Sequence, residues 1–167
     1  PYLRLEKHLL SGPESLQVDV PAFWEYRITV SNTGDIPITN IVLTDTLLID
    51  SILNIERDSN DPKNSISSEL TENRIITWDF PLLNPGENAT RTFRVEGSFR
   101  ATGIRFLSSS FATGDSSLGK INTNHLGGSP ILVTPPRDFE RACVILNKVF
   151  SQYQDRACFQ DLSVNIS

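Results

Sequence analysis

The stretch WEYRITVSNTGDIPITNIVLTDTL, residues 24–47, decides the fold class of this chain. In its first half apolar residues alternate with polar ones, and the apolar set is Trp24, Tyr26, Ile28 and Val30. That period of two predicts a strand with one buried face and one wet face. Asn-Thr-Gly-Asp at 32–35 follows, with a glycine that can take positive φ and side chains that can hydrogen-bond the local backbone. A second alternation runs to Leu47, so the stretch predicts two strands joined by a tight turn and contains no catalytic signature.

The same kind of alternation, separated by turn signals, recurs along the first 134 residues. We expect further strands at residues 2–10, 74–80, 89–99, 104–113 and 131–134. The side chains expected to point inward from two of them are Ile76, Trp78, Phe80, Phe93 and Val95. Residues 51–73 and 115–129 are less regular and are expected to be loops. About seven short strands predict an all-β fold, an immunoglobulin-like antiparallel β-sandwich spanning residues 1–134.

Composition excludes several classes of partner. The chain has 167 residues, with 15 Lys and Arg scattered singly against 20 Asp and Glu, a net charge of −5. A surface that tracks phosphates is therefore not expected, and we predict no nucleic acid partner. No apolar run approaches the roughly 20 residues of a membrane helix, so no membrane insertion is predicted. The absence of Met indicates that this is not a complete primary translation product.

A C-terminal extension, residues 135–167, follows the predicted sandwich. Pro135 and Pro136 cannot donate to a β-ladder, so they mark a linker before a Cys-containing arm. The arm fits either a β-hairpin with strands at 143–150 and 158–166, or a helix from Phe139 with an apolar stripe. Its β-branched residues favour strands. The residues expected to join a neighbouring subunit's sheet edge are Val144, Leu146, Val149, Phe150, Leu162, Val164 and Ile166.

The two cysteines, Cys143 and Cys158, both lie in this arm. In a hairpin or on one continuous helix their Cα atoms would be about 20 Å apart. A disulfide needs Cα atoms within about 7 Å, so the pair cannot close within the arm under either arrangement. The two thiols are therefore candidates for an intersubunit disulfide, and the alternative is that they are two small buried apolar side chains.

Two motif blocks carry a family resemblance. YRITVSNTGDIPITNIVLTDTL (26–47) and WDFPLLNPGENATRTFRVEGS (78–98) resemble, in this order, the repeat called domain of unknown function 11 (DUF11). The resemblance covers about residues 1–114 and implies an immunoglobulin-type sandwich of bacterial surface and fibre proteins, with no catalytic residues to carry over. LNKVFSQYQDRACFQDLSV, residues 146–164, is similar to Cys-containing segments of spore-surface proteins of endospore-forming Firmicutes. Together they imply an extracellular location, at the bacterial cell surface or the spore surface.

Surface domains of this type sometimes carry an internal amide cross-link between Lys and Asn, assisted by a buried carboxylate. Lys7 on the first strand and Asp45 in TDTL are candidates for the amine and the carboxylate. The third group is missing, because residues 107–110 read Leu-Ser-Ser-Ser; Asn122 or Asn124 would have to substitute. The alternative is that Lys7 is a solvated strand residue and Asp45 forms a turn.

No other chemistry is indicated. The Asp- and Asn-rich segment 58–64 begins like a calcium loop, but Pro62 stands at a ligand position and the closing Glu is not at the required distance. His8 and His125 have no metal-ligating neighbours in sequence and are expected at the surface. No nucleophile elbow accompanies the many serines. We therefore expect no enzyme activity, no metal and no cofactor.

These observations predict a non-enzymatic structural subunit of a bacterial surface or spore-surface fibre or appendage. It would assemble with copies of itself or related subunits through the C-terminal arm. The alternative is an adhesin or ligand-binding module that recognises its target with the long loops at 51–73 and 115–129.

Overall fold

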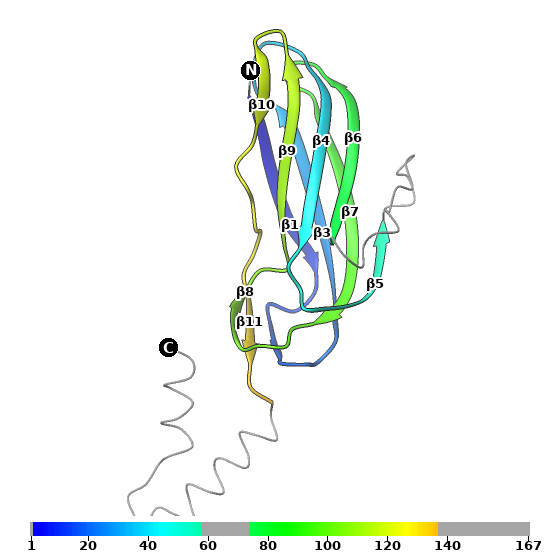
Figure 1. The fold of residues 1–167 in the computed structure, drawn as a ribbon, viewed down its shortest axis with the longest axis vertical. Coiled ribbons are helices and arrows are strands. Elements are labelled where there is room, and N and C mark those ends of the chain that lie inside the picture. Colours follow the sequence, from blue (N-terminus) through cyan, green and yellow to red (C-terminus); the bar gives the residue numbers. More distant parts are fainter. Residues whose placement is uncertain (1, 58–73, 137–167) are drawn as a thin grey trace, which may run out of the picture.

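The computed structural model describes residues 2–57 and 74–136, and these form a β-sandwich (Figure 1). The described residues contain strands and no helix. The strands are β1 (Leu3–Ser11), β2 (Ser15–Gln17), β3 (Ala22–Asn32), β4 (Ile38–Leu47), β5 (Ser51–Arg57), β6 (Ile75–Leu83), β7 (Asn88–Ser98), β8 (Gly103–Arg105), β9 (Ser108–Ser116), β10 (Gly119–Asn122) and β11 (Ile131–Thr134). The predicted immunoglobulin-like, all-β class is confirmed.

Two four-stranded antiparallel sheets make the body of the sandwich. Their strand orders are β1-β3-β7-β5 and β10-β9-β4-β6. A third, three-stranded sheet, β2-β11-β8, lies at the end of the sandwich away from the start of β1 (Figure 1). In it β11 pairs parallel with β2 and antiparallel with β8. The small sheet therefore closes one end of the body, and it contains β11, the last strand of the described residues.

The turn predicted at residues 32–35 is present, but it carries the chain from one sheet to the other. β3 and β4 lie in different sheets, so they do not pair with each other. Asn32 holds the crossing, because its side-chain amide donates to the carbonyl oxygens of Ile36 at 2.8 Å and Leu83 at 3.0 Å. Its Oδ1 accepts from the Gly34 N–H at 3.0 Å. The motif thus joins the two layers rather than forming a hairpin.

Three sequence expectations about strands need correction. Residues 104–113 are not one strand: β8 and β9 belong to different sheets, and the fully buried Leu107 lies between them. The start of the expected loop 51–73 is an edge strand, β5, paired with β7. Within the expected loop 115–129, β10 pairs with β9, and Leu126 forms a β-bridge with Ser110. The described residues therefore hold eleven strands, more than the seven expected.

The core lies between the two large sheets, as the alternation predicted. Every side chain predicted to point inward is at most 5% exposed: Trp24, Tyr26, Ile28, Val30, Ile76, Trp78, Phe80, Phe93 and Val95. The Tyr26 and Phe93 rings stack at 5.8 Å between centroids, and Trp24 meets Phe99 edge-on at 5.8 Å. Each such side chain contributes roughly 1.5–3 kcal/mol by leaving water. Apolar burial therefore supplies the main stabilisation of the body.

The strand β11 ends at Thr134, next to the predicted linker. Residues 137–167 lie outside the described residues, so the domain boundary and the choice between hairpin and helix stay predictions. Within 2–57 and 74–136, no helix is long and apolar enough to cross a membrane.

Candidate functional site

A cluster of polar side chains interrupts the apolar core. It consists of Lys7 on β1, Asp45 on β4, and Ser108 and Ser110 on β9. The side chains of Lys7 and Asp45 are both 0% exposed, and both serines are fully buried. Because β1 belongs to one sheet and β4 and β9 to the other, the cluster connects the two layers. We call it the Lys7 cluster.

Its contacts form a short chain. Lys7 Nζ donates to Asp45 Oδ1 at 3.0 Å and, in a short hydrogen bond, to Ser108 Oγ. Ser110 Oγ donates to the same Asp45 oxygen at 2.8 Å. Asp45 Oδ2 is buried and has no hydrogen-bond partner among the described residues. The ammonium and one carboxylate oxygen are thus paired, and the other oxygen is not.

Strand register explains why these residues meet. On β4 the inward positions are Ile41, Leu43, Asp45 and Leu47. Asp45 lies opposite Ser110 on β9, and Leu47 lies opposite Ser108. The inward residues of β9 are small, which leaves room for the long side chain of Lys7 to reach across from β1. The inward orientation of Lys7 could be predicted from the sequence, because Lys7 belongs to the same alternating series as the apolar residues Leu3, Leu5 and Leu9.

Aromatic rings and a glycine surround the lysine. Its Nζ lies 5.2 Å from the centroid of the Tyr26 ring and 5.9 Å from that of Phe93. Gly128, with φ of +75°, lies beside it: a Cβ there would be 3.3 Å from Lys7 Cδ and 3.4 Å from Tyr26 Cε1. The backbone before β11 therefore packs directly on the lysine and the tyrosine.

Burial dominates the electrostatics. It lowers the pKa of Lys7, and the charge of Asp45 and its hydrogen bond oppose this effect only in part. Burial, followed by the negative charges of Asp45 and Glu14, raises the pKa of Tyr26 to about 12. The Tyr26 hydroxyl is buried without a hydrogen-bond partner among the described residues. Both groups thus favour their neutral forms more than they would in water.

The structure brings together two of the residues that the sequence singled out. Lys7 is not a solvated strand residue and Asp45 does not form a turn, so that alternative is wrong. Asn122 and Asn124 are exposed, whereas the group beside Lys7 Nζ is the Ser108 hydroxyl. An amide at Lys7 stays a hypothesis. As observed, the cluster is a non-covalent link between the sheets.

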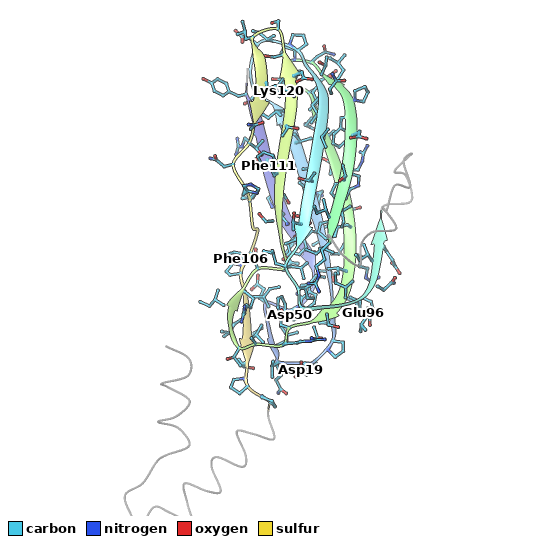
Figure 2. All side chains as sticks on the ribbon, viewed as in Figure 1. Asp19, Asp50, Glu96, Phe106, Phe111 and Lys120 are labelled. Atoms are coloured by element: carbon cyan, nitrogen blue, oxygen red, sulfur yellow. The ribbon has the colours of Figure 1, made fainter. Side chains whose placement is uncertain are left out.

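The remaining candidates are placed as follows. His8 and His125 are exposed. His125 stacks on Phe111 of β9 with ring centroids 4.7 Å apart, and Phe111 is labelled in Figure 2. In the part of the chain that the structure describes, no three His, Cys, Asp or Glu residues gather as a metal site would require. The calcium-like segment 58–64, the two cysteines and all the arm residues lie outside the described residues, so their roles stay predictions.

Comparisons with known proteins identify no family. No family model matches the chain, and no curated protein matches it, so the DUF11 resemblance stays a prediction. Among solved structures, the chain is similar to a GH20 exo-β-N-acetylglucosaminidase from Vibrio harveyi (16% identity, TM-score 0.39), over 81% of this chain and 19% of the other. It is similar to BslA, a bacterial hydrophobin, at 12% identity and a TM-score of 0.48, over 81% of this chain and 96% of the other. It is also similar to BcpA, the major pilin subunit of Bacillus cereus, at 11% identity and a TM-score of 0.41, over 80% of this chain and 40% of the pilin.

Proposed function

We propose that this chain is a non-enzymatic structural subunit of a bacterial surface or spore-surface fibre or appendage, and that it assembles through residues 135–167. The body supports this role because its buried charges, Lys7 and Asp45, connect its two sheets and contact each other. A side chain that is 0% exposed cannot act on a substrate from solvent. The polar chemistry of the described core therefore serves rigidity.

The observation that carries the proposal is an apolar surface at the end of the body where the extension begins. Ile104 on β8 is 72% exposed, and its register partner Leu132 on β11 is 48% exposed. Phe106, where the chain leaves β8 for β9, is 43% exposed (Figure 2). We call these three residues the end patch. Exposed apolar groups that cluster, rather than scatter, are typical of contact surfaces.

The sheets also offer places for an added strand. The body sheets end at β1, β5, β10 and β6, and β6 is nine residues long. An arm from a neighbouring subunit would gain ladder hydrogen bonds at such an edge, and its alternating apolar residues would set the register. Cys143 and Cys158 would then be placed to lock the contact between subunits.

The adhesin alternative is less well supported. Part of its recognition segment is held against the body: Ser110 and Leu126 exchange two backbone hydrogen bonds. A Cβ on Gly127 would lie 3.0 Å from the Phe106 ring. A segment packed in this way has little freedom to adapt to a ligand.

Electron microscopy of the full chain tests the proposal, and filaments are expected. A variant with Val164→Asp and Ile166→Asp should stay monomeric, because charges at these positions oppose burial at a sheet edge. Arg27→Asp is a matched control, since Arg27 is an exposed residue outside the arm on β3, a strand that is already paired on both sides. Filaments that survive the arm substitutions would refute assembly through the arm. A monomeric unmodified chain would refute the fibre role.

The cysteines have their own test. Without reductant, the assembled protein should run on a denaturing gel as covalent multimers, and Cys143→Ser with Cys158→Ser should run as a monomer. A monomeric band for the unmodified chain without reductant would contradict the intersubunit disulfide.

A further inference from the structure

The two outer faces of the sandwich differ in charge. The sheet β1-β3-β7-β5 presents charged side chains of both signs, and one cross-strand row consists of Glu25, Arg94 and Glu56. On the other sheet, the outward positions of β9, β4 and β6 carry mainly hydroxyl and apolar groups. They are Val42, Thr44, Thr46, Ile75, Thr77, Ser109, Phe111 and Thr113. We call this set of residues the threonine face.

Strand register places the threonine face on three neighbouring strands (Figure 1). Thr44 on the central strand β4 lies opposite Phe111 on β9 and opposite Thr77 on β6. Thr46 and Val42 occupy the next outward positions of β4 on either side of Thr44. Every member of the face is half-buried or exposed. Thr44 is therefore the centre of a continuous surface of hydroxyl and apolar groups.

The outward charges of this sheet, among the described residues, lie at its margins. Asp79 belongs to the edge strand β6. Asp115 and Lys120 lie where β9 turns into β10, with Oδ1 and Nζ 4.0 Å apart. The chain has a net charge of −5, and like-charged copies repel each other. An uncharged centre is the part of the surface where this repulsion is smallest.

We propose that the threonine face binds the same face of a second copy of this chain. A hydroxyl group both donates and accepts hydrogen bonds, so a surface rich in threonine is complementary to itself. Pairing of one face with its own copy is the isologous contact of a twofold dimer. Two sheets can stack in this way at about 10 Å, the same arrangement that the sandwich uses internally.

The size of the face sets the strength of this contact. Three strands about 4.8 Å apart and about nine residues long, at about 3.3 Å per residue, cover roughly 14 Å by 30 Å. Two such faces together bury about 850 Å² by this flat measure, which is the size of a weak and reversible contact. The face lies on the side of the sandwich, away from the end patch and from residues 135–167. It would therefore join assembled chains side by side.

Sedimentation velocity of the full-length protein tests the inference. The Val164→Asp, Ile166→Asp variant in the presence of reductant is used, so that neither the arm nor a disulfide joins the copies. We expect a reversible equilibrium of monomer and dimer, with a dissociation constant in the micromolar range. A single monomeric species up to about 300 μM would overturn the inference.

A pair of matched substitutions, made in this same variant, locates the contact. Thr44→Lys places like charges from both copies at the centre of the interface and should raise the dissociation constant at least about tenfold. Thr29 is also a half-buried threonine on a strand that is paired on both sides, but it belongs to the charged face. Thr29→Lys should change the constant by less than about twofold. An equal effect of the two substitutions, or no effect of Thr44→Lys, would overturn the inference.

Folding of each variant is followed by the fluorescence of the buried Trp24 and Trp78. If Thr44→Lys does not fold, Thr113→Lys places the same charge on the neighbouring strand β9 and should weaken the dimer in the same way. A folded Thr113→Lys variant with an unchanged dissociation constant would overturn the inference.

The fibre role and the threonine face can fail separately. Filaments of the unmodified chain together with a monomeric arm variant would leave the fibre role intact and refute the contact through the threonine face. A dimeric arm variant that responds to Thr44→Lys, together with an unmodified chain that forms no filaments, would support the contact and refute the fibre role.

Discussion

Two parts of one core differ in what holds them together. In the Lys7 cluster, four polar side chains connect the sheets through directed hydrogen bonds. Near the Asn32 crossing, Ile38, Ile41 and Leu83 are at most 4% exposed, and a Cβ on Gly114 would lie within 3.4 Å of both isoleucines. We call this second part the apolar end. The apolar end is stabilised by buried apolar area and tolerates apolar side chains of similar volume. The Lys7 cluster tolerates only substitutions that keep its charges and hydrogen-bonding groups paired.

The contrast teaches that the two parts have different consequences for the fold. Buried apolar area stabilises the sandwich whatever the orientation of the layers. A buried ion pair adds little net stability, but an arrangement that separates its members leaves a charge unpaired in the core. We therefore expect the Lys7 cluster to specify how β1 lies over β4 and β9, and the apolar end to supply stability.

The largest effect is expected from breaking the ion pair on one side. Lys7→Met keeps the length of the side chain but leaves Asp45 buried without a cation. The free energy of unfolding should fall by about 3–5 kcal/mol, measured by urea denaturation followed by tryptophan fluorescence.

The matched control removes both charges. Lys7→Met with Asp45→Leu should recover most of the loss, because a well-packed apolar pair is often as stable as a buried ion pair. If Lys7→Met alone and Lys7→Met with Asp45→Leu lose the same free energy of unfolding, the unpaired charge of Asp45 costs nothing. The Lys7 cluster would then not specify how β1 lies over β4 and β9.

A cavity in the apolar end should cost less and should have no such rescue. Ile41→Ala removes three carbons from a fully buried position and should lower the free energy of unfolding by about 3 kcal/mol. Ile41→Leu, which keeps the volume, should cost less than about 1.5 kcal/mol. A loss for Ile41→Leu as large as that for Ile41→Ala would show that shape, and not buried volume, governs this end as well.

The turn at the apolar end combines both kinds of interaction. Asn32→Ala leaves the Gly34 N–H and the carbonyl oxygens of Ile36 and Leu83 without their side-chain partner. We expect a loss of about 2 kcal/mol in thermal or urea denaturation. Asn32→Asp is the informative control, because it keeps the acceptor for Gly34 and removes the two donated bonds. A variant as stable as the original would show that water replaces these contacts without cost.

The sequence predicted the layers of the fold better than its connections. Inward positions followed from the period of two at Trp24, Tyr26 and Ile28, because alternation depends only on local geometry. The sequence did not show that the turn after Val30 crosses between sheets, because a tight turn fits either a hairpin or a crossing. The division between β8 and β9 was missed for a similar reason: the direction of the chain changes beside Leu107, and no Gly or Pro marks the change.

The candidate site was predicted in part. The family resemblance singled out Lys7 and Asp45. The alternation of inward and outward residues along their strands also predicts that both side chains point into the core. The contribution of Ser108 and Ser110 was not foreseen, since a serine on a strand has no sequence signal that separates a solvated hydroxyl from a buried one. Only the pairing of β4 with β9 brings the Ser110 hydroxyl to Asp45 and the Ser108 hydroxyl to the position where it meets Lys7 Nζ.

The smallest effect concerns Tyr26, the residue that borders the Lys7 cluster and packs in the apolar core. Its pKa is raised from 10.0 to about 12 in the folded state. Because the folded pKa exceeds the unfolded one, the folded state holds the proton more tightly between these values. The tyrosine's contribution to stability is therefore full below pH 10 and is lost as the pH rises through 12, with a loss of about 1 kcal/mol expected at pH 11.

Tyr26→Phe isolates this contribution. The hydroxyl has no hydrogen-bond partner among the described residues, so the substitution should change stability by less than about 1 kcal/mol at pH 7. Between pH 9 and pH 11, measured by urea denaturation, the variant should lose about 1 kcal/mol less than the original chain. The lowered pKa of Lys7 acts in the opposite direction, since it makes stability rise with pH up to 10.5, but it is common to both proteins. If the stability of Tyr26→Phe and of the original chain changed with pH in parallel, the Tyr26 hydroxyl would be reached by water. The edge of the Lys7 cluster would then be more accessible to solvent than the apolar end.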